Sequence, residues 1–393
     1  MRRSTDQDKR PAWLEIRPAP HLGGGDSFAQ MTRSMLIVVG LAGLAGVAVF
    51  GLMAAIWLAV AVGTAVVAEW AYVQLTGGRV TATYDHAALM GLLLGLTLPV
   101  GWVDDAGFHP LGWAVPLIGA LVAIVVGKGL MGGMGNYLWH PALVGRAATE
   151  LLYDQQMHPE RWVVLGRNHL FAAVPKPVES IEYAGWRISQ LPADANAWVL
   201  RRPVEWLRQL ADGLPAGDES PLTVLIRDHL PPWEDLLLGG VGGGIGETCT
   251  IALIVGGLYL VYRGYVRWYQ PMSVIVAAAV AAAVLPIRIG PAASFDWLPG
   301  LQTDAGLPIG AIYVLYHLTG GELMLAALLF ATDTVASPCT ARGQVIFGAA
   351  IGVLAIALRL YGPMPGSCYW AILIMNTFVG LIDRRTKRRV MGT

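Results

Sequence analysis

The sequence predicts an all-α membrane protein of about ten transmembrane helices, built as two inverted five-helix repeats with a periplasmic loop lobe between them. Three observations support this prediction: the composition, the spacing of apolar runs, and a long polar interruption after the fifth run. Of the 393 residues, 55% are hydrophobic and 14% are charged, and the mean hydropathy is +0.54. A soluble core of this size encloses fewer apolar side chains, so we expect lipid to solvate the surplus.

Both halves of the chain contain apolar runs that predict membrane helices. A helix needs about 20 residues to cross about 30 Å of hydrocarbon. Several runs are shorter, so some helices must include flanking polar residues or be discontinuous. The runs cover residues 35–50, 54–73, 87–103, 111–131 and 142–152, and then 248–262, 272–287, 307–330, 345–360 and 369–382.

Basic residues predict the orientation, because the short cytoplasmic loops of membrane proteins are rich in Lys and Arg. Arg79, Arg263 and Arg342 lie in short connections, and both ends of the chain are basic. We therefore expect a multi-pass protein of the cell inner membrane with both termini in the cytoplasm. The predicted parts are a cytoplasmic N-terminal segment (1–34), a first membrane half (35–153), a periplasmic loop (154–235), a second membrane half (236–383) and a basic cytoplasmic tail (384–393).

Glycines interrupt the apolar runs at comparable depths in the two halves. Gly132, Gly133 and Gly135 follow the fourth run, and Gly320 and Gly321 interrupt the eighth. An odd number of spans in the first half makes the second half enter the membrane in the opposite orientation, and in such folds paired breaks form the binding site. The alternative is that these glycines only allow close helix packing.

Composition also limits the partners and cofactors. The net charge is zero and the basic residues form no groove-sized patch, so no nucleic acid is expected. Cys249, Cys339 and Cys368 are widely spaced, which argues against a zinc site, an iron–sulfur cluster or a c-type haem held by this chain alone. We expect membrane lipid and membrane proteins as partners, and a redox cofactor that is organic or shared with a partner.

Several motifs follow one another in a fixed order. Residues 128–147 read KGLMGGMGNYLWHPALVGRA, residues 242–248 read GGGIGET, residues 317–321 read HLTGG and residues 330–337 read FATDTVAS. They resemble the GGxGxxxxNPAxxGRA, GSxGExS and HLxxGG…FxATDPVS segments of the D subunit of Rnf complexes and the B subunit of Na⁺-translocating NADH:quinone reductase (Nqr). His140 replaces the usual Asn. The resemblance extends from about residue 30 to the C-terminus and is weakest in 153–210.

The resemblance implies a membrane subunit of an ion-translocating electron-transport complex, with the other subunits of an Rnf/Nqr-type complex as partners. It also implies FMN attached by a phosphoester to the Thr of an outer-loop SGATPL sequence, where this chain reads GDESPL at 217–222. Ser220 is the aligned hydroxyl, but Asp218 and Glu219 would repel a flavin phosphate. The alternative is that Ser220 caps a helix that begins at Pro221.

The glycine motifs and the polar residues of the apolar runs give candidate cofactor-binding and ion-pathway residues. FMN, riboflavin and quinone are the candidate cofactors, and Na⁺ or H⁺ is the coupling ion. Backbone that approaches the cofactor closely is expected at Gly132, Gly133, Gly135, Gly244 and Gly246. Asp333 and Glu247 are the ion-pathway candidates, because a charge within apolar spans is costly unless it is paired or hydrated. The alternative for Asp333 is a capping role or a salt bridge to Arg342. No catalytic residue and no metal site is predicted.

Burying a polar group in an apolar span is also costly for four further residues that lie in or beside the runs: Lys128, His317, Glu322 and Asn376. Two other functions stay open on the same fold. An inverted bundle with a broken helix is also the architecture of small-solute transporters and channels, and the resembled family has a fold similar to that of urea channels. A scaffold subunit without a cofactor is the third interpretation. Flavin absorbance of the purified chain separates the first interpretation from the other two.

The orientation gives a direct prediction. Reporters fused at Gly213 and at Thr393 should report a periplasmic and a cytoplasmic location respectively, because the short basic loops place 154–235 outside and the tail inside. A periplasm-specific reporter that is active at Thr393, or a cytoplasm-specific one active at Gly213, contradicts both the orientation and the inverted repeat.

Overall fold

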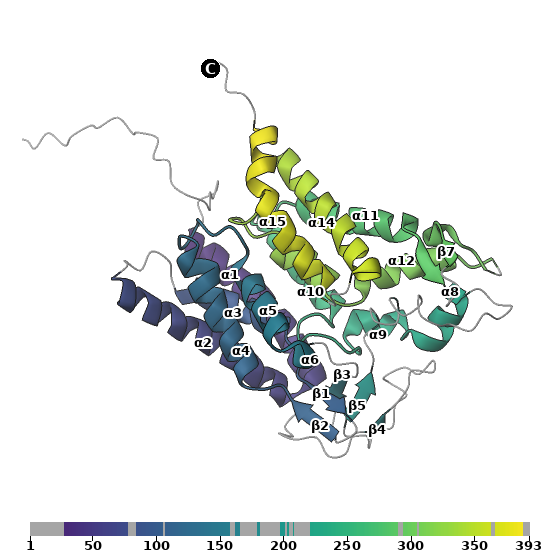
Figure 1. Ribbon diagram of the computed structural model, residues 1–393, viewed down its shortest axis with the longest axis horizontal. Coiled ribbons are helices and arrows are strands. Elements are labelled where there is room, and N and C mark those ends of the chain that lie inside the picture. Colours follow the sequence, from purple (N-terminus) through teal and green to yellow (C-terminus); the bar gives the residue numbers. More distant parts are fainter. Residues whose placement is uncertain are drawn as a thin grey trace, which may run out of the picture.

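The arrangement of the chain is taken from a computed structural model, which describes residues 27–77, 84–104, 107–157, 162–165, 179–180, 197–200, 203, 207, 221–289, 294–304, 306–362 and 366–387. Within these ranges the chain is predominantly helical (Figure 1). Each predicted apolar run falls on a helical segment, which confirms the mainly helical fold class.

The first half contains helices whose ends follow from local sequence. They are α1 (Phe28–Phe50), α2 (Leu52–Thr76), α3 (Tyr84–Leu96), α4 (Ala114–Val122), its π-helical continuation η1 (Ala123–Leu130), and α5 (Pro141–Leu152). Ser27 caps α1, since its hydroxyl accepts a hydrogen bond from the Gln30 N–H while the Gln30 side chain accepts one from the Ser27 N–H. Pro141 lies in the first turn of α5, where an N–H has no helical partner in any case.

The second half is also helical and contains one sharp bend. Its helices are α10 (Thr250–Tyr262), α11 (Tyr269–Val284), α12 (Ile309–Thr319), α13 (Leu323–Leu325) with its π-helical continuation η6 (Ala326–Phe330), α14 (Ala341–Tyr361) and α15 (Ser367–Thr386). The α12 and α13–η6 segments meet at an angle of 61°. Gly321 adopts φ 77° there, a backbone conformation that favours glycine. The predicted interruption at Gly320 and Gly321 is therefore confirmed.

Two small sheets were not predicted from the sequence. Strands β1 (Gly101–Asp104), β2 (Gly107–Pro110), β3 (Trp162–Leu165), β4 (Glu179–Ser180) and β5 (Ala197–Leu200) form one sheet in the order β2-β1-β3-β5-β4, and β6 (Ile287–Ile289) pairs with β7 (Ser294–Asp296). The predicted run 87–103 was accordingly wrong at its end. Helix α3 stops at Leu96 because Pro99 disfavours helical backbone before it, and the chain turns into β1.

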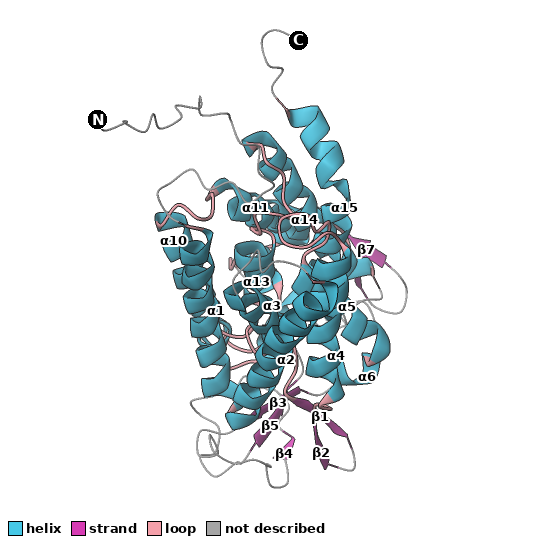
Figure 2. Cartoon of the chain, turned by 90° about the vertical axis from the view of Figure 1, so that its left-hand side faces the viewer, coloured by secondary structure: helices cyan, strands magenta, loops and turns pink. Residues whose placement is uncertain are grey.

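Between the halves lie the short helical segments α6 (Asp154–Met157), α8 (Pro221–Val224), η4 (Leu225–His229) and α9 (Trp233–Leu238), and within the second half the 3₁₀ turn η5 (Pro299–Leu301) precedes α12. The larger sheet lies at one end of the bundle, at the bottom of Figure 2, and α15 ends at the opposite end. This arrangement separates the sheet, built partly from the predicted periplasmic loop, from the end where the chain finishes.

Helix length and exposed apolar side chains fit a membrane environment. Among the described residues, α1, α2 and α14 are each long and apolar enough to cross a bilayer, and the bent pair α12 and α13–η6 passes the same test as one unit. Shorter apolar helices are α3, α4 with η1, α10 and α11. Large apolar side chains face outward, among them Leu44 at 67%, Leu75 at 87% and Tyr262 at 86% exposure. Lipid is the solvent that such a surface suits.

The two halves pack closely through glycines. Gly246 of the loop before α10 donates its N–H to the carbonyl of Leu96, and Ile245 donates to Leu98, so this loop is hydrogen-bonded to the end of α3. A Cβ at Gly46 of α1 would lie 2.0 Å from the Ile245 carbonyl oxygen. These contacts fix the second glycine motif against the first half of the bundle.

The packing of α4 on α5 gives a stability prediction. A Cβ at Gly145 would lie 2.3 Å from the Gly119 carbonyl oxygen and 2.9 Å from the Ala123 Cβ. Gly145→Ala should therefore force the helices apart and cost about 1–3 kcal/mol of unfolding free energy. Thermal unfolding of the detergent-solubilised chain measures this. Gly63→Ala is the matched control, because nothing lies within 4 Å of its Cβ position and alanine is the better helix former. Equal losses for the two variants contradict the prediction.

Candidate functional site

The interrupted segments of the two halves meet at Asp333. Asp333 follows η6 and the Ala331–Thr332 turn, and Tyr137 lies in the loop between η1 and α5. The Tyr137 hydroxyl donates to Oδ1 of Asp333 at 3.2 Å, and the Ala336 N–H donates to Oδ2 at 3.1 Å. The bond to Ala336 closes a local turn, and the next helix, α14, begins only at Ala341 with Thr340 as its cap. The described side-chain partner of Asp333 is Tyr137 and not Arg342, whose side chain is exposed.

The first glycine motif forms the turn that brings Tyr137 to Asp333. Gly132, Gly133 and Gly135 have φ values of 110°, 80° and 85°, which L side chains rarely adopt. The Gly133 N–H donates to the Lys128 carbonyl at 2.9 Å and so ends η1. Nothing lies within 4 Å of the Cβ position of Gly133. These glycines are required for the turn itself, and their predicted contact with a cofactor stays a prediction.

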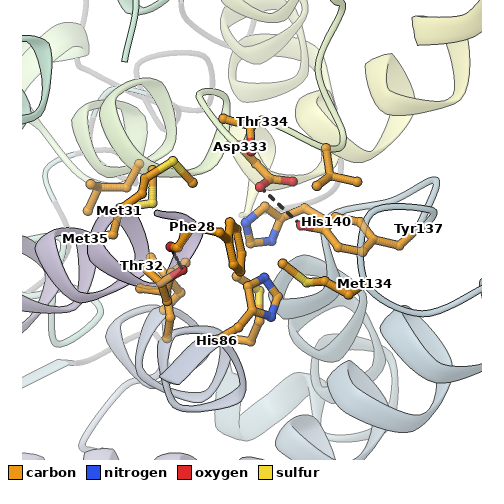
Figure 3. A pocket seen from close by; sticks show the side chains of 15 residues that line it. Phe28, Met31, Thr32, Met35, His86, Met134, Tyr137, His140, Asp333 and Thr334 are labelled. Carbon is orange, nitrogen blue, oxygen red and sulfur yellow. Dashed lines mark hydrogen bonds between the residues drawn. The ribbon is translucent and has the colours of Figure 1, made fainter. Parts of the chain in front are cut away.

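A small pocket lies beside the contact between Tyr137 and Asp333 (Figure 3). It is lined by the first turns of α1 and α3, the loop before α5 and the turn after η6, and Phe28, Thr32, His86, His140 and Asp333 are among its residues. Its interior offers about 20 Å³ to a water molecule, which is room for one water and far less than a flavin ring needs. The Nδ1 atoms of His86 and His140 are buried and have no hydrogen-bond partner among the described residues.

Glu247 forms a second buried polar centre. Its side chain is 2% exposed, and it accepts hydrogen bonds from the Tyr369 hydroxyl at 2.7 Å and from the Gly244 N–H at 3.0 Å. A Cβ at Gly244 would lie 2.9 Å from the Glu247 carboxyl carbon, and one at Gly246 would lie 2.6 Å from the Leu96 Cβ. The close approach at these glycines is therefore to the chain itself. Their role in cofactor binding stays a prediction.

Aromatic rings connect the two centres. His140 and Phe330 meet edge to face at 5.0 Å, and Phe330 and Tyr369 do so at 5.5 Å. Arg146 lies 5.8 Å from the centre of the Tyr369 ring. Asp333 and Glu247 are thus separated by packed aromatic side chains, and each acidic group holds a tyrosine hydroxyl.

The other polar residues of the apolar runs also have partners. Lys128 pairs with Glu69 of α2 at 2.6 Å, and Glu322 pairs with Arg359 of α14 at 3.6 Å. With its amide turned to match its neighbours, Asn376 donates to the Ala336 carbonyl at 3.0 Å and accepts from the His140 N–H at 3.1 Å. Among the described residues no group of His, Cys, Asp and Glu is arranged to hold a metal ion.

The flavin-attachment position, Ser220, lies outside the described residues. The helix expected after it is present, since α8 begins at Pro221. Tyr137, Tyr369 and Arg359 were not predicted as site residues. Tyr137 lies inside the first motif, which is the signal that could have identified it. Arg359 is the one charged side chain of the run 345–360, which is the signal that singled out Lys128, whereas Tyr369 carries no local signal.

Known proteins similar to this chain share most of its length. A sequence model of the NQR2, RnfD, RnfE family matches residues 15–392. The chain is 30% identical over 386 residues to the D subunit of the ion-translocating oxidoreductase complex of Halorhodospira halophila, covering 96% of this chain and 95% of the relative. It is 28% identical to the D subunit of the Na(+)-translocating ferredoxin:NAD(+) oxidoreductase complex of Acetobacterium woodii, over 96% of this chain and 95% of the relative. It is also 28% identical to the proton-translocating counterpart of Clostridium ljungdahlii, over 96% of each chain.

Proposed function

The chain belongs to the NQR2, RnfD, RnfE family, and from that premise we propose that it is the D subunit of an ion-translocating oxidoreductase complex of the Rnf type. In this role it sits in the cell inner membrane with both termini in the cytoplasm, as two inverted repeats of about five spans. It works together with the other subunits of the complex, and it couples electron transfer to the movement of Na⁺ or H⁺.

The observation that supports this function most is the contact of the two interrupted segments at Asp333. A carboxylate at that position, half-buried beside a small pocket, attracts a cation or a proton, and the cost of burying its charge is lowered by the hydroxyl of Tyr137 and the N–H of Ala336. Glu247, held by Tyr369, provides a second acidic position deeper in the bundle. Two acidic groups separated by aromatic rings are suited to stepwise ion transfer and not to an open pore.

Flavin would supply the electron-carrying chemistry when bound, and Ser220 is the residue that aligns with the attachment threonine of the family. The described chain resumes directly after Ser220 with α8 and η4, in which Leu222 and Leu225 are buried. Beyond the covalent site, riboflavin or quinone is proposed at the glycine motifs. At Gly244 and Gly246 the adjoining space is filled by Glu247 and Leu96, so a ring there requires these side chains to move.

The ion-pathway proposal predicts the effect of removing one charge. Asp333→Asn should preserve assembly, because the amide keeps the shape, its oxygen accepts from the Ala336 N–H and its NH2 donates to the Tyr137 hydroxyl. It should reduce ion-coupled electron transfer about tenfold, which corresponds to about 1.4 kcal/mol. Ion uptake into vesicles that contain the whole complex measures this, and Glu247→Gln should act in the same direction. Asp85→Asn is the control, since Asp85 forms an exposed pair with Arg33. Unchanged ion uptake with Asp333→Asn would show that Asp333 has a structural role only.

The flavin proposal predicts a gel result. If the chain carries covalent FMN, then Ser220→Ala abolishes the fluorescent band seen on denaturing gels after co-expression with a flavin transferase. We expect no band from the native chain, because Asp218 and Glu219 place about two negative charges beside the phosphate. Replacing Gly217-Asp218-Glu219-Ser220 by Ser-Gly-Ala-Thr should create the band. A native band that survives Ser220→Ala shows that the attachment site lies elsewhere.

A further inference from the structure

The break between α12 and α13 is surrounded by buried charge. Helix α12 ends at Thr319, Gly320 and Gly321 follow, and Glu322 precedes α13. The side chains of Glu322 and Arg359 are 0% and 1% exposed. Charged groups buried this deeply are retained only when they are paired and hydrogen-bonded, so their contacts indicate what they hold in place.

Arg359 of α14 contacts both sides of the break. One terminal nitrogen donates to the carbonyl of His317, in the last turn of α12, at 2.6 Å. The other lies 3.6 Å from Oε1 of Glu322, on the far side of the glycines. A single planar guanidinium therefore joins the last turn of one half-helix to the residue that begins the next.

Neighbouring groups fix the same junction to α15. Oε1 of Glu322 accepts from the Ser367 hydroxyl at 3.0 Å and from the Cys368 N–H at 3.5 Å. The Nδ1 atom of His317 lies 3.5 Å from Nη1 of Arg359, which is the nitrogen that donates to the His317 carbonyl. The His317 ring packs edge to face against the Tyr313 ring, with 4.6 Å between the ring centres.

The junction is connected to Asp333 by the helical segment α13–η6 and the hydrogen-bonded turn that follows it. The Ala326 N–H donates to the Glu322 carbonyl, the Ala331 N–H donates to the Ala326 carbonyl, and the Asp333 N–H donates to the Phe330 carbonyl. A change in the 61° bend therefore displaces Asp333 relative to Tyr137.

We infer that Arg359 is the positioning residue of this break: by joining His317 to Glu322 it sets the bend, and through the bend it sets where Asp333 stands in the ion pathway. This inference rests on the proposed function for its effect on ion transfer, although the structural part stands without it. Lysine cannot replace arginine here, because an ammonium is a point charge and lacks the planar fork that reaches two acceptors at once.

The experiment compares Arg359→Lys with Ile356→Ala. Ile356 is a fully buried residue of the same helix, so its truncation lowers stability without removing a contact across the break. Spin labels at Leu315→Cys on α12 and at the native, exposed Cys339 beyond η6 report the bend in the purified full-length chain, with Cys249 replaced by serine. Vesicles containing the whole complex give the ion concentration at half-maximal electron transfer.

Arg359→Lys should shift and broaden the distance between the labels, and it should raise the half-maximal ion concentration by about fivefold or more. Ile356→Ala should lower the midpoint of thermal unfolding but leave the label distance and the half-maximal ion concentration at their wild-type values. Glu322→Gln, which keeps its hydrogen-bond acceptor and loses its charge, should produce a smaller shift in the same direction and serves if Arg359→Lys does not accumulate.

A wild-type distance and a wild-type ion dependence in both Arg359→Lys and Glu322→Gln overturn the inference, even if both variants are less stable. A wild-type complex without ion-dependent electron transfer overturns the proposed function instead. In that case the label distances still decide whether Arg359 holds the bend.

Discussion

Backbone that leaves a helix inside an apolar bundle must find partners, and the rest of this structure depends on how that is achieved. Each half interrupts a helix, and an ion pair that is buried or largely buried lies beside each interruption. At the end of η1, the Lys128 ammonium lies 2.6 Å from the Glu69 carboxylate of α2. At the break after α12, the Arg359 guanidinium lies 3.6 Å from the Glu322 carboxylate. Because an isolated charge is costly in this environment, these residues occur in pairs, and the pairs join the broken segments to intact helices.

Polar groups consequently gather where the helices are interrupted, and the candidate site lies there too. Asp333 and Tyr137 come from different halves, and their contact exists only when both interrupted segments are in place. Glu247 depends in the same way on a loop that is hydrogen-bonded to the end of α3. Family membership indicates the class of reaction, whereas the geometry indicates which residues of this chain are placed to take part in it.

The sequence predicted the helices well because a membrane helix needs only a long apolar run, which is a local property. It also located the breaks, since glycine at 132, 133 and 321 supplies backbone conformations that other residues avoid. The strands were missed because β3, β4 and β5 are two to four residues long and lie in a polar segment. Partners such as Tyr137 and Asp333, 196 positions apart, depend on tertiary packing, and no pattern in one sequence reveals them.

The π-helical segments η1 and η6 also affect the directions in which Tyr137 and Asp333 point. A π-helical turn contains about one residue more than an α-helical turn. Both segments, at Ala123–Leu130 and Ala326–Phe330, immediately precede the turns that carry Tyr137 and Asp333. Each α-helical residue corresponds to a rotation of about 100° and a rise of about 1.5 Å. Whether the Tyr137 hydroxyl points toward the Asp333 carboxylate therefore depends on the number of residues in these segments as well as on their type. Inserting or deleting one residue in either segment would rotate one of the two side chains away from the other.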